Sequence, residues 1–110
     1  LSKIKHTNHS SKLNIKGWEI ITAYELGHLE EMRYLIDSSK HFLQNDTKIS
    51  DQKKNKFLNF LNFMLRLLSL KDMKAGKSEV TYSAEELNAE IKNTDTPHKT
   101  WLLEKAIEFT

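Results

Sequence analysis

Apolar residues recur at intervals of three and four along most of this chain, a spacing typical of amphipathic α-helices. Only three glycines and one proline occur among the 110 residues, so few positions interrupt a helix. One run, Glu79–Tyr82, would suit a short extended segment, but a single such run cannot build a sheet. The sequence therefore predicts an all-α fold of about five helices arranged as antiparallel hairpins.

The first predicted hairpin covers residues 14–44. Its apolar pattern is broken once, at Gly27, and glycine is common just after a helix because it tolerates positive φ. We therefore expect helices over about 14–26 and 29–44, joined by a tight turn at residues 26–28. The apolar positions of this hairpin are Trp18, Ile21, Tyr24, Leu29, Met32, Leu35, Ile36, Phe42 and Leu43.

A third helix is predicted over residues 51–73, with Ser50 as its N-cap. Its apolar residues cover most of the circumference, and its polar residues form only a narrow stripe. Because such a helix is usually covered on two sides, we expect it to be the central buried element. The wide apolar face comprises Phe57, Phe60, Leu61, Met64, Leu67, Leu68 and Leu70, extended by Leu58, Phe63 and Leu65.

The last predicted element is a helix pair over residues 83–109. Ser83 and Glu86 have the spacing of a capping box, which predicts a helix of about three turns after Ser83. Thr96 followed by Pro97 predicts a fifth helix with Thr96 as N-cap and Pro97 in its first turn.

Length and charge suggest one packed domain preceded by a basic segment. A chain of 110 residues fits a single domain with one core, and residues 1–13 are expected to be a basic lead-in. The net charge of +2 hides four blocks of alternating sign: residues 1–16 carry +4, 17–46 carry −4, 47–77 carry +6 and 78–110 carry −4. Such alternation suits helical layers packed beside oppositely charged neighbours.

The hairpin resembles a tetratricopeptide-type repeat unit. The matching positions are Trp18, Ile21, Ala23, Tyr24, Leu26, Gly27, Glu30, Glu31, Ile36 and Ser39. The departures are a spacing from Tyr24 to Gly27 that is one residue short, and Met32 in place of a small alanine. There is also no closing proline and no second copy of the motif. The resemblance implies an α-α superhelix fragment that binds peptides or proteins.

Residues 56–70, 87–92 and 101–105 are similar to the C-terminal end of large uncharacterised bacterial helical-repeat proteins. That similarity implies a C-terminal repeat-and-cap fragment, and the family has no established catalytic residues. A terminal piece of a solenoid would expose an apolar surface where preceding repeats pack. The first residue is Leu1 rather than Met, which agrees with the expectation of a fragment of a longer protein.

Catalytic and metal-binding patterns are not found in the sequence. There is no cysteine and no His-Glu-x-x-His motif. The acid pairs Glu30-Glu31 and Glu85-Glu86 fall in first helical turns, where carboxylates favour the helix dipole. Gly76-Lys77-Ser78 resembles only the tail of a phosphate-binding loop and is interpreted as a turn. We expect no enzyme activity, no cofactor and no metal site.

The basic cluster Lys48–Lys56 offers an alternative function, in a small helical domain that associates with nucleic acid by charge attraction. No basic helix carries base-reading side chains at a suitable spacing, so a solvated charged face is favoured. No secretory signal or apolar run long enough for a membrane span is visible. A soluble, cytoplasmic protein is therefore expected.

The favoured hypothesis is a non-catalytic helical-repeat domain with a role in protein–protein interaction or structural capping. Its exposed apolar surface would be covered by a protein or peptide partner, by the upstream part of its own chain, or by another copy in a homo-oligomer. The first hairpin supplies the candidate partner-binding residues, which are Tyr24, Glu25, His28, Glu31 and Tyr34.

Overall fold

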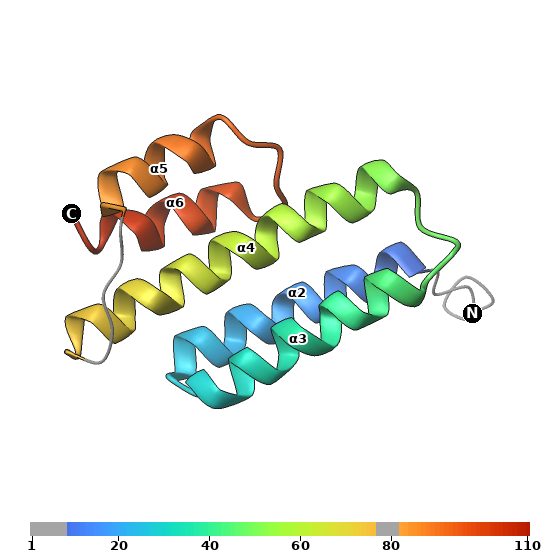
Figure 1. Ribbon diagram of the computed structural model, residues 1–110, viewed down its shortest axis with the longest axis horizontal. Coiled ribbons are helices and arrows are strands. Elements are labelled where there is room, and N and C mark those ends of the chain that lie inside the picture. The colour runs from blue at the N-terminus through green and yellow to red at the C-terminus, as the bar shows by residue number, and fades with distance from the viewer. Residues whose placement is uncertain (1–8, 77–81) are drawn as a thin grey trace. The chain divides into compact units, whose positions relative to one another are not determined.

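The computed structural model describes the backbone of residues 9–76 and 82–110, and the side chains of these residues from Lys12 onward (Figure 1). Within these ranges the chain forms five α-helices and no strand, which confirms the predicted all-α fold. Except for Tyr82, the run considered for an extended segment lies outside the described residues. No described helix combines the length and the apolar character needed to cross a bilayer.

The chain divides into two compact units, residues 1–55 and 56–110. The first unit contains helices α2 (His9–Leu26) and α3 (Leu29–Asn45), together with the first turn of α4 (Asp51–Lys74). The second contains the rest of α4, α5 (Ala84–Lys92) and α6 (Lys99–Ile107). The prediction of a single domain stays a prediction.

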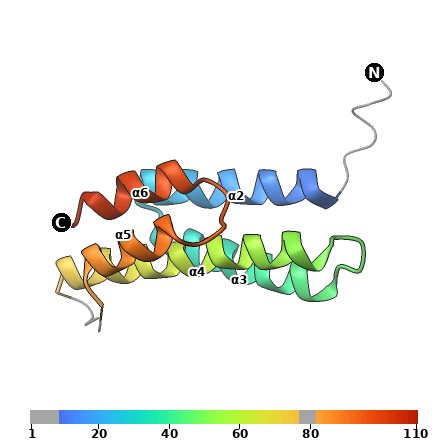
Figure 2. The same cartoon turned by 90° about the horizontal axis from the view of Figure 1, so that it is seen from above.

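Helices α2 and α3 form the expected antiparallel hairpin, and they lie side by side in Figures 1 and 2. The beginning of α2 differs from the prediction. The helix already includes residues 9–13 of the segment expected to be a basic lead-in, and residues 1–8 are outside the described part. Leu13 explains the extension, because it is buried and lies two turns before Ile20 on the same helical face.

Gly27 closes the hairpin in the predicted way. Its φ is +75°, and the N–H of Gly27 donates to the carbonyl of Tyr24 at 3.1 Å. The N–H of His28 donates to the carbonyl of Ala23 at 2.9 Å. These two bonds form a Schellman motif, which satisfies carbonyls at the end of α2 and reverses the chain.

Asp46 organises the connection between α3 and α4. Its Oδ1 accepts hydrogen bonds from the backbone N–H groups of Lys48 at 2.7 Å and Ile49 at 2.9 Å. This turn brings Ile49 into a buried position and is followed at once by Ser50. The Ser50 hydroxyl accepts from the N–H of Lys53 at 3.3 Å, so Ser50 is the N-cap of α4 as predicted.

Helix α4 carries a broad buried face, and its bounds differ by one residue from the predicted 51–73. The buried positions follow helical spacing and cover roughly half of the circumference. Leu58 and Leu65, which were expected to widen the face, are half-buried. The buried side chains are Phe57, Phe60, Leu61, Phe63, Met64, Leu67, Leu68 and Leu70.

Polar contacts connect α4 to the C-terminal part of the second unit. The Arg66 guanidinium donates to Glu90 Oε2 at 2.5 Å and lies 4.4 Å from the centre of the Tyr82 ring. The Tyr82 hydroxyl donates to the Arg66 carbonyl at 2.9 Å. The hydrogen bond from Arg66 lowers the pKa of Glu90, since it favours the charged carboxylate. Arg66 therefore connects α4 both to α5 and to the segment that precedes it.

The predicted capping box at the start of α5 is confirmed. The Ser83 hydroxyl accepts from the N–H of Glu86 at 3.0 Å, and the N–H of Ser83 donates to Glu86 Oε1 at 3.0 Å. Leu87 and Ile91 of this helix are buried. Each predicted interaction thus satisfies an amide that the first helical turn leaves without a partner.

The prediction for the start of α6 was wrong by two residues. Thr96 is not its N-cap and Pro97 is not in its first turn, because the helix begins at Lys99 after His98. His98 has a φ of 59° in the left-handed region, which separates Pro97 from the helix. The His98 ring packs against Phe60 with 5.2 Å between ring centres. This long-range contact accompanies the unusual backbone conformation, and local sequence patterns do not reveal it.

Replacing Gly27 tests the turn. A Cβ at this position would meet no atom within 4 Å, so the cost of Gly27→Ala is conformational. We expect a loss of about 1–2 kcal/mol in the free energy of unfolding, measured by chemical denaturation. Asparagine enters the left-handed region more readily, so Gly27→Asn should cost less. Equal losses for the two variants would contradict this explanation.

The His98 contact predicts a pH dependence of stability. Burial lowers the pKa of His98 below its ordinary value of 6.5, so the unfolded chain binds this proton more readily than the folded chain. The stability that comes from keeping the His98 ring neutral and packed is fully present above pH 6.5. It is lost as the pH falls through that value towards the lower pKa of His98 in the folded chain.

Chemical denaturation between about pH 7.5 and about pH 5.5 measures the effect, since histidine titrates in that range. In His98→Asn, which keeps a residue suited to positive φ, the decrease in stability should be smaller than in the unchanged chain. An identical decrease in both proteins would exclude His98 as its source.

Candidate functional site

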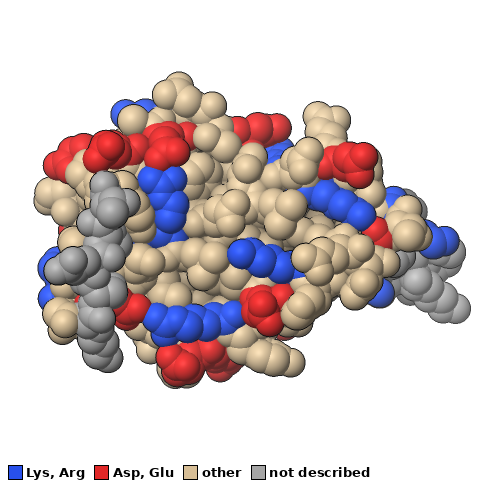
Figure 3. Space-filling model, viewed as in Figure 1, with Lys and Arg blue, Asp and Glu red and all other residues tan. Residues whose placement is uncertain are grey.

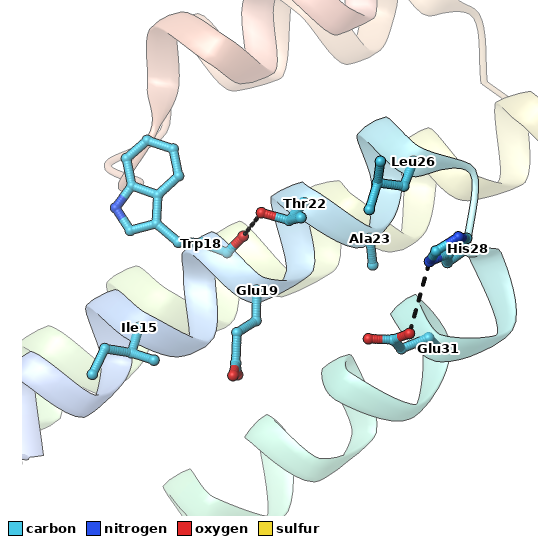
Figure 4. A pocket seen from close by; sticks show the side chains of 8 residues that line it. All are labelled: Ile15, Trp18, Glu19, Thr22, Ala23, Leu26, His28 and Glu31. Atoms are coloured by element: carbon cyan, nitrogen blue, oxygen red, sulfur yellow. Dashed lines mark hydrogen bonds and ion pairs between the residues drawn. The ribbon is translucent and has the colours of Figure 1, made fainter.

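A hollowed surface of the first unit lies along the α2–α3 hairpin. Its volume is about 370 Å³, and it is an open depression rather than an enclosed cavity. Figure 4 shows that α2 supplies most of its lining and that the turn and the first turn of α3 close one end. The lining residues are Ile15, Trp18, Glu19, Thr22, Ala23, Leu26, His28 and Glu31.

A second hollow of about 380 Å³ continues this surface towards the start of α2. It shares Ile15 and Glu19 with the first hollow and adds Lys12 and Lys16 from α2 and Phe42 from α3. The ammonium group of Lys16 lies 5.0 Å from the centre of the Phe42 ring, in cation–π geometry. We call the two hollows together the α2–α3 groove.

Large apolar side chains on the outer face of α2 give the groove its character. Ile15 is 54% exposed, Trp18 58% and Leu26 62%. With Thr22 they fall at helical spacings of three and four and form one line, which we call the α2 stripe. The Thr22 hydroxyl donates to the Trp18 carbonyl at 2.8 Å, so its hydrogen-bonding capacity is used within the helix. The α2 stripe is therefore an apolar surface in contact with water.

Charged groups border the end of the groove near the turn. Nδ1 of His28 lies 3.9 Å from Oε1 of Glu31, and both side chains are exposed. An exposed pair of this kind contributes little to stability. Glu19 of α2 lies between this end and the end that Lys12 and Lys16 line.

The structure separates the five residues predicted to bind a partner. It brings His28 and Glu31 together in the groove. Tyr24 is only 2% exposed and belongs to the core. Glu25 is exposed on α2, and Tyr34 is 70% exposed on α3, but neither belongs to the groove lining.

Sequence reasoning missed the α2 stripe because it assigned Trp18 to the same apolar series as Ile21 and Tyr24. Ile21 and Tyr24 are buried, whereas Trp18 is exposed. Ile15, Trp18 and Leu26 share a face that the buried residues do not share, and this second apolar series was the available signal. Helical spacing shows that two faces exist, but it does not show which one the fold covers.

The described residues hold no group of three or more His, Asp or Glu side chains that could bind a metal ion. In the groove, the nearest approach of ionisable groups is the exposed His28–Glu31 pair. The groove has an apolar centre and charged ends, which are features of a binding surface.

Two lysines of the basic cluster Lys48–Lys56 are engaged within the chain. The Lys54 ammonium donates to the carbonyl of Asp46, and that of Lys56 lies 3.6 Å from Asp95 Oδ1. On the face drawn in Figure 3, acidic side chains lie among the basic ones. These contacts reduce the charge that this cluster can offer to phosphate groups.

Comparison with known proteins finds no matching family model, no matching curated protein and no matching solved structure. The tetratricopeptide-type resemblance and the similarity to bacterial repeat proteins therefore stay predictions.

The exposure of Trp18 predicts how the two tryptophans respond to a collisional quencher. Trp101 is half-buried, and the Lys105 ammonium lies 5.7 Å from the centre of its ring. In Trp101→Phe only Trp18 emits, and in Trp18→Phe only Trp101 emits. Acrylamide should quench the first variant more steeply than the second. The reverse order would show that the α2 stripe is covered in solution.

Proposed function

We propose that this chain is a non-catalytic helical domain that binds protein, and that the α2–α3 groove is its binding surface. The observation that carries the proposal is the α2 stripe, on which Ile15, Trp18 and Leu26 are each more than half exposed. Single exposed apolar residues are ordinary, but a contiguous line of large ones marks an interaction surface.

The composition of the groove suits a helical or extended peptide. Tryptophan is among the residues that most often dominate protein interfaces, because it buries a large area at low conformational cost. A partner that covered Trp18, Ile15 and Leu26 would remove apolar surface from water, which is favourable by about 25 cal/mol per Å². The charged groups at the ends of the groove would then form a polar rim.

Helix α2 provides a regular support for these side chains. Its opposite face is fixed by the buried residues Leu13, Ile20 and Tyr24, and the Gly27 turn holds it against α3. Side chains on regular helices occupy fewer conformations than those on loops. Binding would therefore require less ordering than binding to a loop surface.

Site-specific photocrosslinking tests the proposal. The photoreactive residue p-benzoylphenylalanine would replace Trp18 in cells that produce the chain at its native level. Position 107 is a matched control, because Ile107 is also 58% exposed but lies on α6, outside the groove. We expect crosslinks to protein from position 18 and few from position 107.

A second variant connects the crosslink to the groove. Leu26→Asp places a charge at the far end of the α2 stripe and should weaken crosslinking from position 18, while Ile107→Asp should not. Equal crosslinking from both positions, or none from position 18, would overturn the proposed function.

A further inference from the structure

The two ends of the α2–α3 groove carry opposite charge. Lys12 and Lys16 lie at the end formed by the first turns of α2. Glu31 lies at the end formed by the Gly27 turn. The apolar side chains of Ile15, Trp18 and Leu26 span the distance between these ends.

This arrangement is its own complement when a second α2 runs in the opposite direction. The α2 stripe extends from Ile15 to Leu26, so its midpoint lies between Ile20 and Ile21. A two-fold axis at that midpoint places position 15 of one copy opposite position 26 of the other. It likewise places position 12 near the start of α3, where Glu31 lies.

Isologous interfaces require this kind of self-complementarity, because residue i of one copy meets residue j of the other and the converse holds as well. An antiparallel pair would bring apolar positions together at the centre and lysines near acids at both ends. A partner of uniform charge would be attracted to one end and repelled by the other. The groove therefore fits a second copy better than it fits a uniformly acidic or basic helix.

We propose that a second copy of this chain occupies the groove, with the two α2 helices antiparallel about the midpoint of the α2 stripe. The proposal rests on the proposed function of the groove as a protein-binding surface and names the partner.

The size of the surface predicts a weak dimer. Helix α2 has 18 residues, which corresponds to a length of about 27 Å and a face about 10 Å wide. With the rim of α3, each copy would bury roughly 300–500 Å², so the pair would remain below the about 1,200 Å² of stable complexes. We expect monomers and dimers in rapid exchange, with a dissociation constant between about 1 µM and about 1 mM.

Charge reversal tests both the partner and its orientation. Variant one carries Lys12→Glu and Lys16→Glu, and variant two carries Glu31→Lys. Sedimentation equilibrium of the full 110-residue chain would measure self-association. By symmetry each variant disturbs both ends of the interface, so we expect each alone to associate about tenfold more weakly than the unchanged chain.

The decisive measurement is an equimolar mixture of the two variants. One presents acids at both ends of the groove and the other lysines at both ends, so the mixture should form a heterodimer at least as tight as the original dimer. A control variant with Lys48→Glu and Lys53→Glu has the same change in net charge as variant one, but its changes lie outside the groove. This control should associate as the unchanged chain does. Circular dichroism would check that every variant keeps its helical content.

The outcomes separate this inference from the proposed function. A chain that remains monomeric up to about 1 mM, or a mixture that associates no better than its components, would overturn the second copy as partner. If position 18 still crosslinks to a different protein, the groove remains a binding surface and only its occupant changes. If position 18 crosslinks to no protein, the proposed function fails as well.

Discussion

The α2–α3 groove depends on a backbone conformation that glycine adopts at low cost. With Gly27 at positive φ, the N–H groups of Gly27 and His28 can both bond to carbonyls in the last turn of α2. These bonds end α2 and start α3 within two residues, so the helices run antiparallel and in contact. The same turn places His28 and Glu31 at one end of the groove. A longer connection would leave more freedom in the position of α3 and would separate the charged end from the α2 stripe.

Helix α2 has an apolar residue on almost every side, and this explains both its stability and its exposed surface. Ile20, Ile21 and Tyr24 are buried, which fixes one face by the hydrophobic effect. Ile15, Trp18 and Leu26 remain in contact with water on another face. In the second unit, cations lie over half-buried rings: Arg66 over Tyr82, Lys74 over Phe109 and Lys105 over Trp101. Long basic side chains of this kind shield aromatic surface from water.

Sequence reasoning succeeded where local chemistry determines the structure. The caps at Ser50 and Ser83 and the turn at Gly27 are short-range motifs, and the structure contains all three. It failed where distant residues decide. His98 adopts positive φ with its ring against Phe60, a residue 38 positions earlier in the chain, so the start of α6 moved beyond Pro97. It also failed for Trp18, because the burial of a helical face depends on what packs against it and not on the helix alone.

Of the predicted site residues, His28 and Glu31 follow from the turn, and their place in the groove could be inferred from Gly27. Periodicity places Tyr24 and Trp18 on different faces of α2, since they are six positions apart, but it does not show which of the two faces is buried. The charged residues near this helix add a second observation. Lys12 and Lys16 lie near the start of the α2 stripe, and Glu31 lies beyond its end. A helix that packed this face permanently inside its own unit would gain nothing from separated charges at the ends, because surface charges contribute little to folding. Separated charges do matter for the choice and orientation of a partner, and this supports our proposal that the α2 stripe is a surface for association.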